Sequence, residues 1–172
     1  MNYASVNPTD IANGPGVRVS LFVSGCTHCC KECFNEEAWD FHYGREYTPA
    51  VEAKILEYLD HTYIAGLSFL GGEPLHPRNQ KGIVNLAEEV KRRFPEKTIW
   101  CYTGFDFETD ILGDMMGRLE ETRRLMACID VLVDGKFEAD KKDLKLRFKG
   151  SRNQRIIKVP ESLSSGNIIL WE

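Results

Sequence analysis

The fold is decided by residues 17–33, which read VRVSLFVSGCTHCCKEC. The first seven residues form a mostly apolar run, which predicts a β-strand. Cys26, Cys30 and Cys33 follow that strand with the spacing C-x3-C-x2-C. A loop this short can aim three thiolates at one iron–sulfur cluster, and a cluster normally has four cysteine ligands. With three ligands, one iron stays open to a substrate or cofactor.

The same loop also allows other interpretations. Cys26 and Cys29, and likewise Cys30 and Cys33, form two C-x2-C pairs, and such pairs occur in structural zinc sites. Zinc sites usually separate their pairs by about a dozen residues or more, whereas no residue separates these two. Disulfides are less favoured, because nothing marks the chain as secreted. The cluster is the favoured interpretation, and zinc and free thiols stay open. Cys29 is expected to be a bystander thiol and His28 an ordinary loop residue.

A second candidate site is Gly71-Gly72-Glu73-Pro74, at the end of a predicted strand over residues 64–70. Two glycines at a strand end let backbone groups approach a ligand without obstruction by Cβ atoms. Glu73 adds an acceptor that suits an ammonium group. Most Gly-Gly turns are only turns. The position downstream of the cysteine motif makes this one a candidate ligand site.

The composition is that of a globular protein. A chain of 172 residues is long enough for one domain with a proper core, and 42% hydrophobic and 28% charged residues are ordinary values. The net charge of −4 gives no basic footprint for nucleic acid, and no apolar run has the length of a membrane span. The first residues lack a secretory signal pattern. We therefore expect a cytoplasmic protein that binds neither nucleic acid nor membrane directly.

Strands and helices are predicted to alternate along the chain. Strands are expected at residues 17–23, 64–70, 98–102, 129–133 and 155–159, and helices from Thr48-Pro49 onward, at 79–94 and at 107–126. Gly113 and Gly117 weaken the last helix. Residues 162–166 are expected to be a flexible link, and residues 168–171 to pack back as an edge. This alternation predicts a parallel α/β sheet.

The residues with chemical potential follow the predicted strands. The cysteines, the Gly-Gly-Glu-Pro turn, Thr103, and Asp134 with Lys136 all come after strand ends. Active sites of parallel α/β folds assemble at that edge of the sheet. A complete eight-stranded barrel needs about 250 residues, so this chain is expected to form a partial (β/α) barrel that is open on one side. We expect a large partner to close it.

The two motifs together resemble the radical S-adenosylmethionine superfamily. The resemblance implies a [4Fe–4S] cluster on Cys26, Cys30 and Cys33, with S-adenosylmethionine on the open iron and a 5′-deoxyadenosyl radical that abstracts hydrogen. In such proteins the cofactor supplies the hard chemistry, and the chain binds and orients it. The resemblance implies further cofactor contacts at Glu32 and Phe34 near the adenosyl group, at Gly71, Gly72 and Glu73 near the methionyl group, and at Asp134 and Lys136.

Further segments sharpen the resemblance to the activases of glycyl radical enzymes. They are NGPGVR (13–18), CFN (33–35), GGEPLHPRN (71–79), WCYTG (100–104), DGKF (134–137) and GSRNQ (150–154). They resemble the branch that activates anaerobic ribonucleoside-triphosphate reductase. This implies an activase domain over residues 1–160 and a tail over 161–172. It also implies two partners, the large catalytic subunit of that reductase and a small electron donor such as flavodoxin or ferredoxin. Glu32 and Asn13 depart from the branch, where many members have an aromatic residue and an aspartate.

Two other functions stay open. One is a short radical S-adenosylmethionine enzyme that acts on a small molecule, similar to 7-carboxy-7-deazaguanine synthase, although the Asn-Gly-Pro-Gly and Asp-Gly-Lys-Phe segments argue against it. The other is a zinc-binding interaction module, which does not explain the Gly-Gly-Glu-Pro turn.

Overall fold

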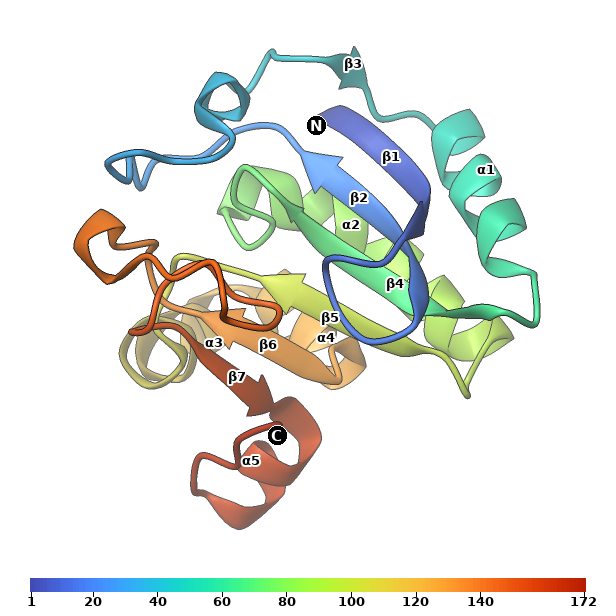
Figure 1. Cartoon of the computed structure of the whole chain (residues 1–172). Helices are drawn as coiled ribbons and strands as arrows, with labels where there is room; N and C mark the ends of the chain where they lie inside the picture. The colour runs from blue at the N-terminus through green and yellow to red at the C-terminus, as the bar shows by residue number, and fades with distance from the viewer.

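The apolar run Val17–Val23 forms strand β2 of a seven-stranded sheet in the computed structural model, which describes all 172 residues (Figure 1). Strands β4 (Ile64–Gly71), β5 (Thr98–Tyr102) and β6 (Val131–Asp134) follow it side by side and run parallel to it. These four parallel strands confirm the α/β prediction for the middle of the sheet.

The edges of the sheet correct the prediction, because they are antiparallel. Strand β1 (Asn2–Asp10), which the pattern did not predict, pairs antiparallel with β2, and the short β3 (Arg45–Glu46) pairs with β1. Only residues 11–16 join β1 to β2, and a parallel pair needs a crossover of a dozen or more residues. Strand β7 (Arg155–Lys158) is antiparallel to β6, and no α-helix lies between the two.

Helix α1 (Pro49–Leu59) begins where the sequence predicted, whereas α2 (Pro77–Arg93) begins two residues before the predicted start at residue 79. Helix α1 is preceded by Thr48, whose hydroxyl accepts a hydrogen bond from the amide of Val51 at 3.4 Å. Helix α2 ends with three basic residues, which favourably meet the negative end of the helix dipole. No helix of the structure combines the length and the apolar character that crossing a membrane requires.

The later helices differ from the prediction. Residues 107–126 do not form one helix but a π-helical segment, Phe107–Met115, then α3 (Met116–Arg118) and α4 (Glu120–Cys128). Leu119 has extended backbone angles and separates α3 from α4. Helix α5 (Val159–Ser165) replaces most of the expected flexible link. Two 3-10 turns, Glu36–Trp39 and Ala139–Lys141, complete the elements.

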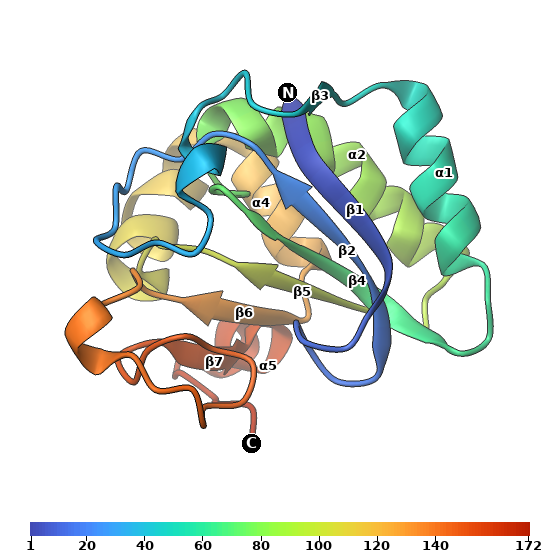
Figure 2. The same ribbon diagram turned by 45° about the horizontal axis from the view of Figure 1, so that its top comes forward.

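The helices α1, α2 and α4 cover one face of the sheet and leave the other face to loops (Figures 1 and 2). Alternate residues of the strands divide between the two faces. Val19, Leu21, Ile99 and Leu132 belong to the main core with the helices. A smaller cluster lies on the other face and includes Trp100, Val131, Val133 and Ile156.

The C-terminal tail packs back on the sheet, as predicted for residues 168–171. Lys158 donates its amide hydrogen to the carbonyl of Ile169, and Trp171 donates to Ile156, each at 2.8 Å. The Trp171 ring meets Trp100 at 5.2 Å between centroids. The tail therefore covers the small cluster on the loop-covered face.

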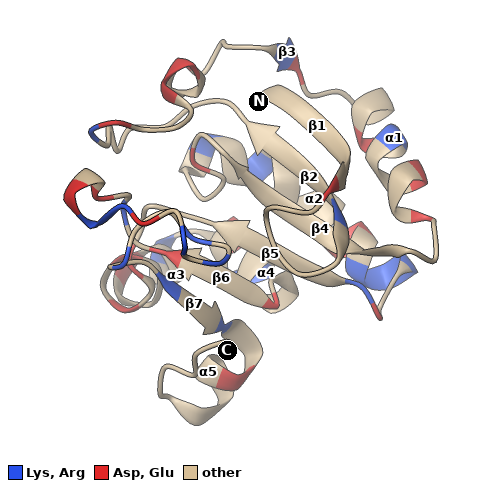
Figure 3. Ribbon diagram, viewed as in Figure 1, with Lys and Arg blue, Asp and Glu red and all other residues tan.

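The strands of the sheet carry few charged residues (Figure 3), and Arg18 in β2 is one of them. It is fully buried, and its guanidinium donates to the hydroxyls of Ser68 (2.8 Å) and Thr98 (3.0 Å) and to the carbonyls of Leu67 (3.0 Å) and Thr98 (2.8 Å). Burial lowers the pKa of Arg18 to about 10, so the group stays charged at neutral pH. This one side chain joins β2, β4 and β5 on their loop-covered face.

Replacing Arg18 by methionine is expected to lower the free energy of unfolding by about 3 kcal/mol, because several buried acceptors lose their donor. Urea denaturation measures the change. Arg92→Met is the control, since Arg92 is exposed and pairs only with Glu89 on the same helix, a kind of contact that contributes about 0.5 kcal/mol. Equal denaturation midpoints for the two variants would contradict the role of Arg18.

Candidate active site

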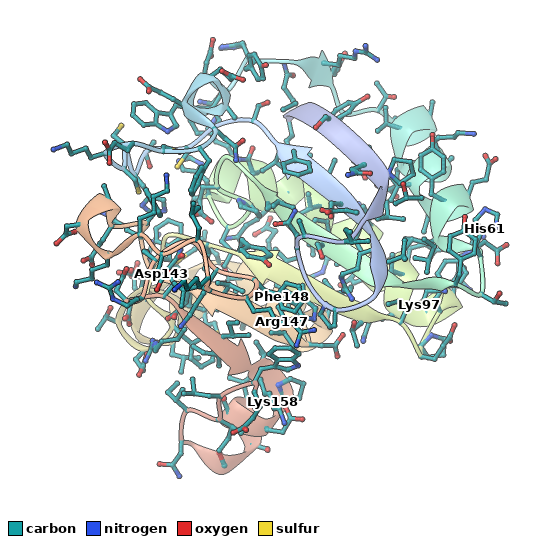
Figure 4. All side chains as sticks on the ribbon, viewed as in Figure 1. His61, Lys97, Asp143, Arg147, Phe148 and Lys158 are labelled. Carbon is teal, nitrogen blue, oxygen red and sulfur yellow. The ribbon has the colours of Figure 1, made fainter.

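A cavity of about 470 Å³ lies at the carboxyl ends of the parallel strands. The loops that follow β2, β4, β5 and β6 contribute to its lining. The segment 143–150 forms another wall on the loop-covered face, where Figure 4 labels Asp143 and Phe148. The cavity is therefore at the edge that the sequence predicted for the active site.

Three of the four thiols in the cysteine loop line this cavity. Cys26, Cys30 and Cys33 are half-buried free thiols in its wall, whereas Cys29 is exposed and does not line it. Cys29 and Glu32 have left-handed backbone angles, with φ of 52° and 59°, which few residues other than glycine adopt. These two reversals of the chain turn the three thiols toward one space.

Burial keeps the thiols of Cys26 and Cys30 protonated when no metal is bound. It raises the pKa of Cys26 to about 11 and also raises the pKa of Cys30, where the ammonium of Lys136 opposes the effect. Metal ligands must be thiolates, so binding of a cluster here releases protons.

The double-glycine turn after β4 lies directly against the start of the cysteine loop. Gly72 donates its amide hydrogen to the carbonyl of Val23 at 2.7 Å, and Glu73 donates to the carbonyl of Gly25 at 2.8 Å. A Cβ atom on Gly72 would lie 2.6 Å from the Gly25 oxygen and 2.9 Å from the Ala38 oxygen. Glycine is therefore required for this close approach. Gly71 and Gly72 both line the cavity.

The carboxylate of Glu73 is buried and fully occupied by the protein. It accepts hydrogen bonds from the Leu75 amide (2.9 Å), the Thr103 hydroxyl (2.8 Å), the Gly104 amide (2.7 Å) and His28 Nε2 (2.7 Å). Glu73 lines the cavity, but its carboxylate already has four donors from the protein, so a contact with a ligand ammonium stays a prediction. Gly71 and Gly72 also line the cavity and leave carbonyl groups of the turn to face a ligand.

Of the other predicted cofactor contacts, one lines the cavity and three do not. Phe34 lines the cavity, and its ring meets Phe137 at 5.0 Å between centroids. Glu32 and Lys136 are exposed and do not line the cavity. Asp134 does not line it either, because its carboxylate accepts hydrogen bonds from Arg155 Nε at 3.0 Å and from the amide of Phe107 at 2.9 Å.

Two aromatic residues that were not predicted as site residues, Trp39 and Tyr102, also line the cavity. The indole nitrogen of Trp39 and the hydroxyl of Tyr102 are buried there without a hydrogen-bond partner. Buried donors in proteins almost always have a partner, so these two fit a cavity that holds a ligand with acceptor atoms. Together with three converging thiols, they fit a cluster and a polar cofactor. Trp39 has no signal in its sequence position, whereas Tyr102 ends the predicted strand 98–102 and lies in the WCYTG segment.

Comparison with known proteins agrees with this geometry. A family model described as a 4Fe-4S single cluster domain matches residues 12–157. Proteins from Pasteurella multocida, bacteriophage T4 and Escherichia coli K12 are 44%, 42% and 41% identical over 90–91% of this chain and 93–96% of their own lengths. Each is named anaerobic ribonucleoside-triphosphate reductase-activating protein. This chain belongs to that family.

For this activating protein, the matched cluster domain contains all three converging cysteines and the double-glycine turn. The family resemblance predicted from the sequence is thus confirmed. A zinc-binding module and an enzyme acting on a small molecule are not favoured by the cluster domain or by the names of the relatives.

Proposed function

We propose that this activating protein generates a glycyl radical on the large catalytic subunit of anaerobic ribonucleoside-triphosphate reductase. A [4Fe–4S] cluster would be held by Cys26, Cys30 and Cys33, and S-adenosylmethionine by the backbone of Gly71 and Gly72. The observation that carries the proposal is that these three thiols and the turn line one cavity, from which Cys29 is left out.

When bound, the cluster and S-adenosylmethionine supply a one-electron reductive cleavage that yields a hydrogen-abstracting radical. The chain's own residues hold and orient these groups. The cysteine thiolates would fix the cluster, and the carbonyls of the double-glycine turn would bind the methionyl end. Phe34 and Phe137 form an aromatic wall beside Cys33, which suits the adenosyl group.

The cavity needs a partner to exclude water. Phe34 and Leu144 line it, yet 62% and 86% of their surfaces are exposed. Exposed apolar residues at the border of a cavity are typical of an interaction site. We propose that the glycine-bearing segment of the reductase enters here, since hydrogen transfer needs the reacting atoms about 3–3.5 Å apart.

Several finer points belong to the same proposal. The sheet would be an open partial barrel of the radical S-adenosylmethionine type, with the activase domain in residues 1–160 and a tail in 161–172. A small reductant such as flavodoxin or ferredoxin would supply the electron, and the protein would work in the cytoplasm. The predicted cofactor contacts that line the cavity are Phe34, Gly71, Gly72 and Glu73.

The test is an anaerobic reaction of the reconstituted protein with a reductase subunit deuterated at glycine. We expect a glycyl radical by electron paramagnetic resonance and deuterium in the released 5′-deoxyadenosine. Without the reductase, cleavage of S-adenosylmethionine should be slow and should yield unlabelled product, because the open cavity admits other hydrogen donors. Unlabelled product in the presence of the reductase, with an intact cluster, would overturn the proposal.

A further inference from the structure

His28 lies within the cysteine loop, yet its side chain points into the protein. Only 9% of the side chain is exposed, and its Nε2 lies 2.7 Å from Oε2 of Glu73. An ionised carboxylate only accepts hydrogen bonds, so Nε2 carries the hydrogen of this contact. The bond joins the loop after β2 to the turn after β4, across 45 positions of the chain.

The same carboxylate also binds the loop after β5. Thr103 Oγ1 donates to it at 2.8 Å and the amide of Gly104 at 2.7 Å. Glu73 is only 1% exposed, so these bonds are screened little by water. One buried carboxylate therefore connects three strand ends that surround the cavity, and His28 is the link to the cysteine loop.

The space around the imidazole is shaped for it. A Cβ atom on Gly104 would lie 2.5 Å from His28 Cδ2, so only glycine at position 104 leaves room for the ring. The Phe105 ring packs edge-on against the imidazole at 4.7 Å between centroids. Both contacts come from the loop after β5, and they fix the orientation that aims Nε2 at Glu73.

No other side chain can replace this link. Apart from the thiols themselves, His28 makes the only side-chain hydrogen bond between residues 27–32 and the rest of the protein. Cys29 is exposed, as are Lys31 and Glu32. Without His28, the middle of the loop would be free to move relative to the double-glycine turn.

We infer that His28 is a positioning residue that sets the distance between the three thiolates and the cofactor-binding turn. The inference rests on the proposed function, because a ligand that touches both the cluster and the turn needs that distance to be fixed. His28 is not a cluster ligand in this proposal, and it raises the affinity for the cofactor through its hydrogen bond to Glu73. A side chain at a position that the cysteine motif leaves unspecified thereby becomes part of the site.

The test uses His28→Ala and His28→Gln in the anaerobically reconstituted protein, with His42→Ala as the control. The His42 side chain is 86% exposed. Three quantities are measured: iron per chain, the melting temperature, and the affinity for S-adenosylmethionine, read from the change it causes in the resonance spectrum of the reduced cluster. Hydrogen exchange of residues 26–33 in the metal-free protein is a fourth readout, which does not involve the loaded protein.

We expect His28→Ala to keep its iron but to bind S-adenosylmethionine about tenfold more weakly, which corresponds to losing one charge-assisted hydrogen bond. Exchange in residues 26–33 should be faster. His28→Gln, whose amide can donate to Glu73, should recover most of the affinity, and His42→Ala should match the wild type.

Two results would overturn the inference alone. The first is that His28→Ala binds S-adenosylmethionine as tightly as the wild type and shows wild-type hydrogen exchange in residues 26–33. The second is that His28→Ala binds less iron and melts at a lower temperature, while the molecules that do hold a cluster bind S-adenosylmethionine with unchanged affinity. The second result would indicate a merely structural role. Failure of the wild-type cluster to respond to S-adenosylmethionine would overturn the proposed function and the inference with it.

Discussion

Alanine at Cys26, Cys30 or Cys33 is expected to abolish cluster binding, whereas Cys29→Ala is expected to retain it. The three thiols line one cavity, and each would supply one of the three protein bonds to the proposed cluster. Cys29 is exposed and does not line the cavity. The expected losses are complete, so they are the largest effects that any single substitution in this chain should produce.

The measurement is iron and sulfide per chain after anaerobic reconstitution, together with the visible absorbance of the cluster. Cys29→Ala serves as the matched control, since it removes a thiol from the same loop. If Cys29→Ala lost iron as completely as Cys26→Ala, the ligand set would be wrong. If all four variants bound zinc but not iron, a zinc site would replace the cluster.

Gly72→Ala is expected to weaken both folding and cofactor binding. The added Cβ would meet two backbone oxygens, those of Gly25 and Ala38, at 2.6 and 2.9 Å. Backbone atoms cannot rotate away, so the turn and the residue before Cys26 must move apart. We expect the free energy of unfolding to fall by about 2–3 kcal/mol, a size typical of overpacked sites. S-adenosylmethionine should bind at least about tenfold more weakly.

The control for this substitution is Gly117→Ala. Gly117 lies in α3, and a Cβ atom there would meet nothing within 4 Å. Alanine should therefore stabilise the protein by about 0.5–1 kcal/mol, because it restricts the unfolded chain. Denaturant titrations of both variants give the two values. A Gly72→Ala protein as stable as wild type would show that the turn is not tightly packed against the cysteine loop.

The sequence predicted the parts of the fold whose signals are local. The apolar strands β2, β4 and β5 and the capped start of α1 depend on neighbouring residues, and all appear where expected. Strand β1 was missed because Asn2–Asp10 contains Asn7, Pro8 and Asp10, which disfavour strands. Its hydrogen-bonded pairing with β2 and β3 stabilises the strand despite the low strand propensity of these residues.

In the candidate site, too, the features with a local sequence signal were predicted and those that depend on tertiary contacts were not. The spacing of the cysteines was enough to separate Cys29 from the three that converge. Asp134 was predicted to contact the cofactor, but its carboxylate binds Arg155 and the amide of Phe107 and does not line the cavity. Val131 and Val133 pack with Trp100 on the loop-covered face, whereas Leu132 packs with the helices, and Asp134 follows the parity of Leu132.

The contact between His28 and Glu73 had no local signal. The two residues are 45 positions apart, and their meeting depends on how β2 and β4 align in the sheet. The same holds for the unpartnered donor of Trp39, which only the shape of the cavity distinguishes.

The placement of the three tryptophans gives the protein an intrinsic optical reporter. Trp39 lines the cavity, where a bound cluster would quench its fluorescence. Trp100 and Trp171 pack against each other and against Phe148, which lies on the wall segment 143–150. Emission from Trp39 thus follows the filling of the cavity, and emission from the other pair follows movement of its wall. Substituting Trp39 by phenylalanine separates the two signals, so that the docking of a partner is followed in real time without an added dye.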